Sequence, residues 1–320
     1  LQTNEFVDGN ANNKAKDARQ KTSGLVDIGL VTEDRKLTEV GLNLLDLSLN
    51  GNFDTNNILQ IDNDSFIFFK QLLKTTVDVD GQIVNPYLVV AGLLQKFGKL
   101  TKEEFTYLAP LVISQESFNS ITNNISLLRN GQSNIDDIIF ERLMSMDNYI
   151  EALDYFLQNQ VTEQVILKVG MNRKSSEHGL CQYDRPYYWL YKAICDYKSN
   201  KTNENVIKIF NAVCSINGKA SNFWKNCLFI NTRRSTIEKD GINCLNNAEI
   251  FNIVSENEFK KEFFKLMHVF KAKATLSDYF DLNKRYLKTT DTILFEDEEV
   301  KFDVIPQCFF KLIGNNIFNV

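Results

Sequence analysis

The chain has 320 residues, of which 43% are hydrophobic, and its net charge is −5. This length allows two or three domains with separate cores, and only four Pro and 14 Gly argue against long structureless linkers. No apolar run approaches the ~20 residues needed to span a bilayer, and the first segment is polar rather than a signal peptide, so we expect a cytoplasmic protein with no membrane partner.

The cysteines do not form a metal-binding pattern. None of the six belongs to a CxxC pair, and only two histidines are present. A zinc site with regular ligand spacing is therefore not expected. Free buried thiols in a reducing compartment are the default interpretation.

The first structured segment, residues 14–45, predicts the back half of a winged helix-turn-helix. A basic polar helix leads into the apolar run Leu25–Leu30, a charged turn follows, and Leu37 begins a second amphipathic run. Thr38 is a suitable N-cap for that second helix. Residues 1–52 are thus interpreted as a winged-helix module, either whole or lacking its N-terminal part, with a small charged helical bundle as the alternative.

A second module is predicted over residues 53–160. It contains an apolar helix over 66–74, a small hairpin around Asp80-Gly81 and a helix that Pro86 opens. Thr101 and Glu104 then have capping-box spacing at the start of a further helix. This order of a helix, a short turn and a second helix resembles a further helix-turn-helix unit. Periodicity predicts helix over 118–167.

The remaining chain reads as helical. Residues 161–255 form a predicted helical module with basic loops, and 256–320 a helical segment and hairpin. The latter region contains predicted helices at 259–270 and 276–287, then a hairpin over 292–302 with an acidic tip. The fold class is therefore expected to be mainly α with small β wings (α+β): tandem winged helix-turn-helix modules followed by a helical region.

Three sets of motifs resemble the AlwI-type family of type IIS restriction endonucleases. The first is Ala18-Arg19 with Leu25–Leu30 and Leu37–Gly41. The second combines FFKQLLK at 68–74, Asn85-Pro86-Tyr87 and LTKEEF at 100–105, and the third is DYFDLNKRYL at 278–287 with Thr290-Asp291. Their order is also that of the family, and together they extend over most of the chain.

The resemblance implies a winged-helix DNA-recognition region followed by a nuclease domain of the PD-(D/E)xK type. Such a nuclease holds Mg²⁺ with two acids and places a lysine near the attacking water. In this chain the best match is Asp291 with Glu299-Val300-Lys301, which we interpret as a solvated hairpin. No catalytic residue and no cofactor are therefore assigned to the chain, and Mg²⁺ is expected for the parent type II site-specific deoxyribonuclease.

We accordingly expect the chain to be the recognition part alone, with the catalytic domain following residue 320 in the parent. The start at Leu1 instead of Met fits a fragment. The recognition sequence, the cleavage offset and the oligomeric state stay open.

The expected partner is double-stranded DNA, contacted by basic side chains. Phosphate contacts are assigned to the N-terminal basic helix and to an arginine pair, namely Lys14, Lys16, Lys21, Arg233 and Arg234. Base readout is assigned to Arg19 and its neighbour Thr22 and to the charged turn with Arg35 and Lys36. Arg173 and Lys174 are further candidates in a polar loop.

Two other functions remain as alternatives. A transcription regulator built on tandem winged helices would bind a palindromic site through a two-fold interface. In a helical protein-interaction scaffold, the acidic net charge would be a functional property and DNA would not be a partner. Steep salt dependence of DNA binding would argue against the scaffold.

Overall fold

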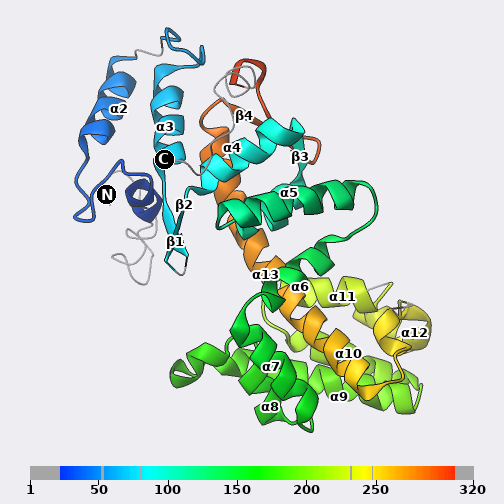
Figure 1. Ribbon diagram of the computed structural model, residues 1–320. Coiled ribbons are helices and arrows are strands. Elements are labelled where there is room, and N and C mark those ends of the chain that lie inside the picture. Colours follow the sequence, from blue (N-terminus) through cyan, green and yellow to red (C-terminus); the bar gives the residue numbers. More distant parts are fainter. Residues whose placement is uncertain (1–21, 52–53, 80, 231–232, 247, 307–320) are drawn as a thin grey trace. The chain divides into compact units, whose positions relative to one another are not determined.

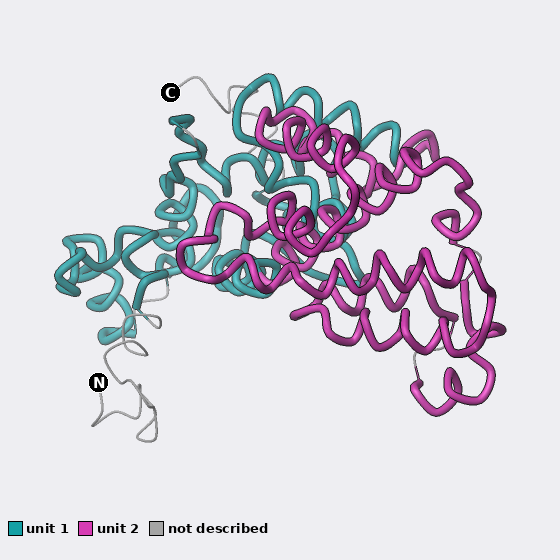
Figure 2. The backbone as a smooth tube through the Cα atoms, turned by 90° about the horizontal axis from the view of Figure 1, so that it is seen from below, with its two compact units in different colours: residues 1–129, 279–320 teal, residues 130–278 magenta. Residues whose placement is uncertain are grey.

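The computed structural model describes residues 22–51, 54–79, 81–230, 233–246 and 248–306. The chain forms two compact units (Figure 2), of which unit 1 comprises residues 1–129 and 279–320, and unit 2 residues 130–278. The structure is mostly helical with small antiparallel sheets, as the sequence predicted. In the described residues, no helix has the length and apolar character needed to cross a membrane.

Unit 1 begins with two helical segments joined by a tight turn. Residues 22–27 are helical, a single β-bridge pairs Val31 with Leu37, and helix α2 follows over Glu39–Asn50. The Thr38 side chain accepts a hydrogen bond from the Gly41 amide at 3.1 Å, which confirms the predicted N-cap. The helix that was predicted before this segment lies partly outside the described residues, so the winged-helix interpretation stays a prediction.

Close backbone packing fixes the start of α2. A Cβ atom at Gly41 would lie 2.1 Å from the Leu30 carbonyl oxygen, so only glycine permits this approach. The same turn is attached to helix α3, because the buried Gln71 amide donates to the Ile28 carbonyl oxygen at 3.2 Å.

The next elements follow the predicted order (Figure 1). Helix α3 spans Asn63–Lys74, strands β1 and β2 (Val77–Val79 and Gln82–Val84) form an antiparallel hairpin, and helix α4 spans Pro86–Phe97. Proline at the first position of α4 needs no amide hydrogen-bond partner there. The hairpin around Asp80-Gly81 and the two flanking helices were predicted from the sequence and are confirmed.

A three-stranded sheet joins the two chain segments of unit 1. Strand β3 (Lys99–Thr101) pairs with β5 (Glu299–Phe302), and β5 also pairs with β4 (Ile293–Glu296), so the antiparallel order is β3-β5-β4. The predicted C-terminal hairpin is thereby confirmed, and Val300 and Phe302 are buried while Glu299 and Lys301 are half-buried.

Two helical segments separated by a short connection follow β3. Residues 102–111 are helical, with a π-helical turn over Glu104–Leu108 and a 3₁₀ turn over Ala109–Leu111, and helix α5 spans Gln115–Arg129. Phe105 contacts Phe280 and Phe295 edge to face, with ring centroids 5.9 and 5.5 Å apart. These contacts attach the first of the two helical segments to the C-terminal part of unit 1.

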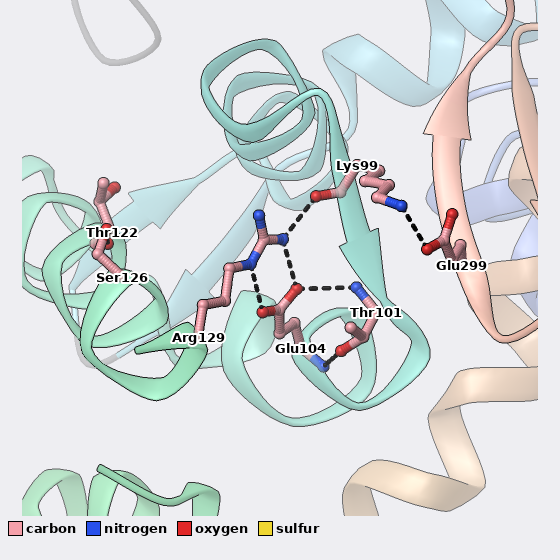
Figure 3. A network of polar contacts seen from close by, with 7 residues as sticks. All are labelled: Lys99, Thr101, Glu104, Thr122, Ser126, Arg129 and Glu299. Carbon is pink, nitrogen blue, oxygen red and sulfur yellow. Dashed lines mark hydrogen bonds and ion pairs between the residues drawn. The ribbon is translucent and has the colours of Figure 1, made fainter. Parts of the chain in front are cut away.

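One buried carboxylate, that of Glu104, connects β3 to both helical segments (Figure 3). Its side chain is 1% exposed and accepts from the Thr101 amide at 2.8 Å, while the Glu104 amide donates to Thr101 Oγ1 at 3.1 Å. The capping box predicted from the sequence is thus confirmed. Arg129, at the end of α5, donates two 2.8 Å hydrogen bonds to Glu104 and a third, at 2.7 Å, to the Lys99 carbonyl oxygen. The pair therefore fixes the end of α5 against β3 and the preceding helix.

Loss of this ion pair is expected to destabilise unit 1. The variant Arg129→Ala leaves the Glu104 carboxylate buried with only one of its three donors, and should lower the free energy of unfolding by roughly 2–4 kcal/mol. This loss is smaller than for a fully buried ion pair, because a third of the Arg129 side chain is exposed. Urea unfolding of the full chain, followed by amide hydrogen exchange in α5, measures the effect.

The matched control is Lys99→Ala. Lys99 pairs with Glu299 at 2.6 Å, but 57% of the Lys99 side chain and 37% of the Glu299 side chain are exposed, so less than ~1 kcal/mol should be lost. Equal destabilisation by the two variants would contradict the importance given to Glu104 and Arg129.

Unit 2 is built from helices, most of them short. The α-helices that lie wholly within it are α6 Ile135–Met144, α7 Asp147–Gln158, α8 Glu163–Val169, α9 Arg185–Ser199, α10 Asn203–Ser215, α11 Ala220–Leu228 and α12 Arg234–Cys244. Three 3₁₀ segments, Arg173–His178, Leu180–Asp184 and Glu249–Phe251, connect them.

Two details of the predicted helices were wrong. The helical stretch expected over 118–167 is four helices, and its first break is at Gly131, where φ is +71°. Conversely, the two helices expected at 259–270 and 276–287 form one helix, α13, over Glu256–Lys288, which contributes residues to both units. The intervening residues 271–275 (KAKAT) contain good helix formers and nothing that ends a helix.

A buried histidine lies in the core of unit 2. His268 is fully buried, with its ring 4.1 Å from Phe264 and 5.2 Å from Tyr149 between centroids. Burial, together with the positive charge of Arg173, lowers the pKa of the His268 imidazole to about 3. The folded protein therefore keeps this ring neutral at pH values where an unfolded chain protonates it.

This difference predicts acid sensitivity of unit 2. The unfolded chain binds the additional proton below pH ~6.5, so the stabilisation is complete above that pH and is lost as pH falls toward 3, by up to about 1.4 kcal/mol per pH unit. Urea unfolding at a series of pH values gives the acid limb, that is, the decrease in the free energy of unfolding with falling pH. This limb should be shallower for His268→Met than for the wild type. The control His178→Met, at an exposed histidine, should keep the wild-type limb, and identical limbs for all three proteins would contradict the assignment.

Candidate nucleic-acid interface

The predicted basic helix falls largely outside the described residues. Lys14, Lys16, Arg19 and Lys21 lie there, so their proposed DNA contacts stay predictions. Thr22 is described, and its carbonyl oxygen accepts a hydrogen bond from Arg35 Nη1 at 3.5 Å. The structure therefore brings together two of the predicted contact residues, Thr22 and Arg35.

Arg35 and Lys36 lie in an exposed tight turn between the Val31–Leu37 bridge partners. The Thr32 amide donates to the Lys36 carbonyl oxygen at 2.8 Å, and the Lys36 amide donates to Thr32 Oγ1 at 3.2 Å. Arg35 has φ of +63°, in the left-handed region that tight turns require. The turn thus displays two cationic side chains to solvent, and the base readout that was expected of them from the sequence stays a prediction.

Arg173 has a structural environment that the sequence did not indicate. Its guanidinium donates to the Gly170 and Asn148 carbonyl oxygens, both at 3.0 Å, and lies 4.6 Å from the Tyr149 ring centroid. The neighbouring Lys174 is exposed. Of this predicted pair, therefore, Lys174 is the residue that the structure presents to solvent.

The buried Asp184 carboxylate organises the chain before Arg173. It accepts hydrogen bonds from the Asn172 amide at 2.8 Å and from Asn172 Nδ2 at 2.9 Å, and it is 1% exposed. Burial raises the pKa of this carboxyl, while the Asn172 hydrogen bonds act in the opposite direction. The segment predicted as a polar loop is thus a pair of 3₁₀ turns held by an internal acid.

Arg233 and Arg234 lie at the exposed start of α12. Arg233 occupies the N-cap position, and Arg234 Nε pairs with Glu238 Oε1 at 2.7 Å, one helical turn away. Both Arg234 and Glu238 are well exposed, so this pair is weak and leaves Arg234 free to exchange partners. These arginines belong to unit 2, whereas Arg35 and Lys36 belong to unit 1.

The D…ExK candidate does not form a metal site. Glu299 lies opposite Glu296 at the turn end of the hairpin, whereas Asp291 precedes the base of β4. The three strand steps from Glu296 back to Ile293 alone span roughly 10 Å at ~3.3 Å per residue, whereas the ligands of one Mg²⁺ lie about 2.1 Å from the ion.

Each member of the candidate has another partner. Asp291 accepts from Ser65 Oγ at 3.0 Å, Glu299 pairs with Lys99 at 2.6 Å, and Lys301 pairs with Glu296 at 3.0 Å. Among the described residues, no group of three or more His, Cys, Asp or Glu side chains could hold a metal ion. The Mg²⁺ implied by the family resemblance therefore does not fit the described residues, and no catalytic step is assigned to them.

Helix α5 carries a polar surface that the sequence analysis missed. Its exposed side chains are mostly uncharged hydrogen-bonding groups: Gln115, Asn119, Ser120, Asn123 and Ser126, beside the acid Glu116. The buried face consists of Phe118, Ile121, Thr122 and Ile125. The signal was present as apolar residues at helical spacing, with Gln, Asn and Ser filling the positions between them.

Comparison with known proteins identifies the family. A family model described as the AlwI restriction endonuclease matches residues 26–319, which include almost all of the described residues. Neither a curated protein nor a solved structure matches the chain. The chain belongs to the AlwI restriction endonuclease family, so the resemblance found in the motifs is confirmed. Membership implies a role in restriction and DNA as the substrate.

The two members of the 173–174 pair are expected to differ in what they affect. Arg173→Ala removes two hydrogen bonds and a ring contact, and should lower the free energy of unfolding by about 1–3 kcal/mol. Lys174→Ala should change it by less than ~0.5 kcal/mol but, if Lys174 contacts a phosphate, should reduce the slope of log K against log salt by about one. Urea unfolding and a salt titration of DNA binding measure these effects; a destabilised Lys174→Ala would contradict the division.

Proposed function

We propose that the described part of the chain recognises a specific double-stranded DNA sequence, as the specificity region of a type IIS restriction endonuclease. Family membership supports the restriction role. The observation that carries the recognition role is the order of elements in unit 1, which places a helix-turn-helix segment next to a three-stranded antiparallel sheet.

The element order supports a winged-helix interpretation of unit 1. In a winged helix, the chain order is helix, strand, helix, helix, strand, strand, and the first strand pairs with the last. Unit 1 has α4, β3, the helical residues 102–111, α5, β4 and β5, with β3 paired to β5. Residues 130–278 lie between α5 and the hairpin in the chain, so the module is divided by unit 2. In this interpretation α5 is the second helix of the helix-turn-helix, the one that enters the major groove.

Phosphate contacts are proposed for the exposed cations among the described candidates, and for Arg35 and Lys36 this proposal replaces the base readout expected from the sequence. Arg35 and Lys36 are exposed cations in unit 1, in a turn that also carries the exposed acids Glu33 and Asp34. Lys174, Arg233 and Arg234 add exposed cations in unit 2. Because the chain carries a net charge of −5, affinity for DNA depends on such local cationic surfaces and not on the overall charge.

The proposal is tested by selection from a randomised duplex library at ~150 mM salt, where non-specific phosphate binding is weak. A short asymmetric consensus is expected for a type IIS specificity region. A palindromic consensus would favour a regulator-like dimer instead, and the absence of enrichment would contradict sequence-specific recognition.

The double variant Arg35→Ala/Lys36→Ala tests the turn that carries these two cations. If both residues contact phosphates, the slope of log K against log salt should decrease in magnitude by about two, and affinity should fall for all duplexes alike. Fluorescence anisotropy with the selected duplex and with an unrelated duplex measures both quantities. The control Lys201→Ala removes an exposed lysine outside the proposed contacts and should leave the slope unchanged; an unchanged slope in the double variant would remove the turn from the interface.

A further inference from the structure

Three amide side chains form a row along the exposed face of α5. Gln115, Asn119 and Asn123 are each separated by four residues. At about 100° per residue, the second and third are rotated by only about 40° and 80° from the first, and successive members are about 6 Å apart along the axis. We call Gln115, Asn119 and Asn123 the amide row.

The composition of this face is unfavourable for a helix that only meets water. Solvated helix faces usually carry Glu, Lys, Arg and Gln, which are good helix formers and make pairs four residues apart. Asn and Ser are poor formers because their side chains compete for backbone hydrogen bonds. Exposed interior positions of α5 nevertheless hold Asn119, Ser120 and Asn123. Asn also occupies exposed positions of α10 and α11 (Asn211, Asn222 and Asn226), so α5 is distinguished by these residues together with its place beside the three-stranded sheet of unit 1.

Both ends of α5 are held by hydrogen bonds. At the start, Ser117 Oγ accepts from the amides of Ile113 and Ser114, both at 2.8 Å, and the Ser117 amide donates to Ser114 Oγ at 3.2 Å. At the end, Arg129 is bound to Glu104 and to the Lys99 carbonyl oxygen. The amide row is therefore presented from a fixed helix, as readout of a ligand requires.

The electrostatic character of α5 favours base contacts over phosphate contacts. Among the residues of α5, all of which are described, the one cation is Arg129, whose guanidinium is already bound to Glu104. Uncharged amides contribute little to phosphate neutralisation. An amide does, however, offer one acceptor and one donor side by side, which matches the N6 amino group and N7 of adenine in the major groove.

We propose that Asn119 and Asn123 of the amide row read base edges in the major groove, and that the recognition sequence of this protein includes an adenine contacted by at least one of them. The proposal rests on the DNA-recognition function proposed above. An α-helix of 10–12 Å diameter fits the major groove, which is about 12 Å wide, and DNA is the substrate implied by family membership.

Gln115 positions Asn119 for this contact. Gln115 Nε2 donates to Asn119 Oδ1 at 3.1 Å. Asn119 retains the second lone pair of Oδ1 and both hydrogens of Nδ2, which is what a bidentate contact to adenine uses. Gln115 is thus a positioning residue, and Asn119 and Asn123 are the readers.

The test compares duplex selection by the full-length wild type, Asn119→Ala and Asn123→Ala. At least one of the two variants should lose preference at one adenine position and keep the remaining consensus, and its affinity for the wild-type duplex should fall roughly 5- to 150-fold. The matched control is Asn124→Ala, the same change on the same helix but about 140° from Asn119 and half-buried, which should keep the full consensus. Alanine is the better helix former, so the variants should fold, as circular dichroism can verify.

A second measurement removes the acceptor from the DNA instead of the donor from the protein. Replacing the selected adenine by 7-deazaadenine should weaken binding by the wild type and have no further effect on the variant that lost preference there. If the wild type selects no consensus, the proposed DNA-recognition function fails. If it selects a consensus that both Asn variants retain, or one without adenine, DNA recognition stands and the assignment of base readout to the amide row is overturned.

Discussion

The ion pair between Glu104 and Arg129 is the interaction on which the organisation of unit 1 depends. It connects strand β3, the capping box of the helical segment that follows this strand, and the last residue of α5. A carboxylate that is 1% exposed is stable only with all its hydrogen-bond donors in place. Other positions of α5 relative to β3 would leave the buried charge of Glu104 unpaired, so this ion pair determines where α5 lies against the strand.

This constraint gives the proposed recognition surface its physical basis. Specific base readout needs side chains held in a narrow range of positions, whereas phosphate attraction does not. In unit 1, cations that suit phosphate contacts lie in the exposed turn at Arg35 and Lys36, and the amides of α5 lie on a helix fixed at both ends. Affinity and specificity are thus assigned to different elements of the same unit.

Local features of this structure could be predicted from sequence, and non-local ones could not. The Thr38 cap, the Thr101–Glu104 capping box and the β4–β5 hairpin all involve residues close in the chain, and each was predicted. The partner of Glu104, Arg129, is 25 residues away, and β3 pairs with a strand 200 residues later. A three-residue strand such as Lys99–Thr101 has no periodic signal, so its pairing is defined only by tertiary packing.

The candidate site shows the same division. Basic residues were easy to select by type, but type did not reveal that the Arg173 guanidinium is bound to two backbone carbonyls. The D…ExK pattern was correctly interpreted as a hairpin, because strand register separates its two acids. The amides of α5 were missed because Asn and Gln carry no charge pattern, and their significance depends on which face of the helix is exposed.

The most direct measurement of the central claim is the specificity ratio of Arg129→Lys, that is, its affinity for the selected duplex divided by its affinity for an unrelated duplex. Lysine keeps the charge but cannot make the bidentate contact with Glu104, so α5 should lose its fixed position while the surface cations remain. We expect a ratio at least ~10-fold below that of the wild type, with non-specific affinity unchanged. A wild-type ratio in the folded variant would contradict it.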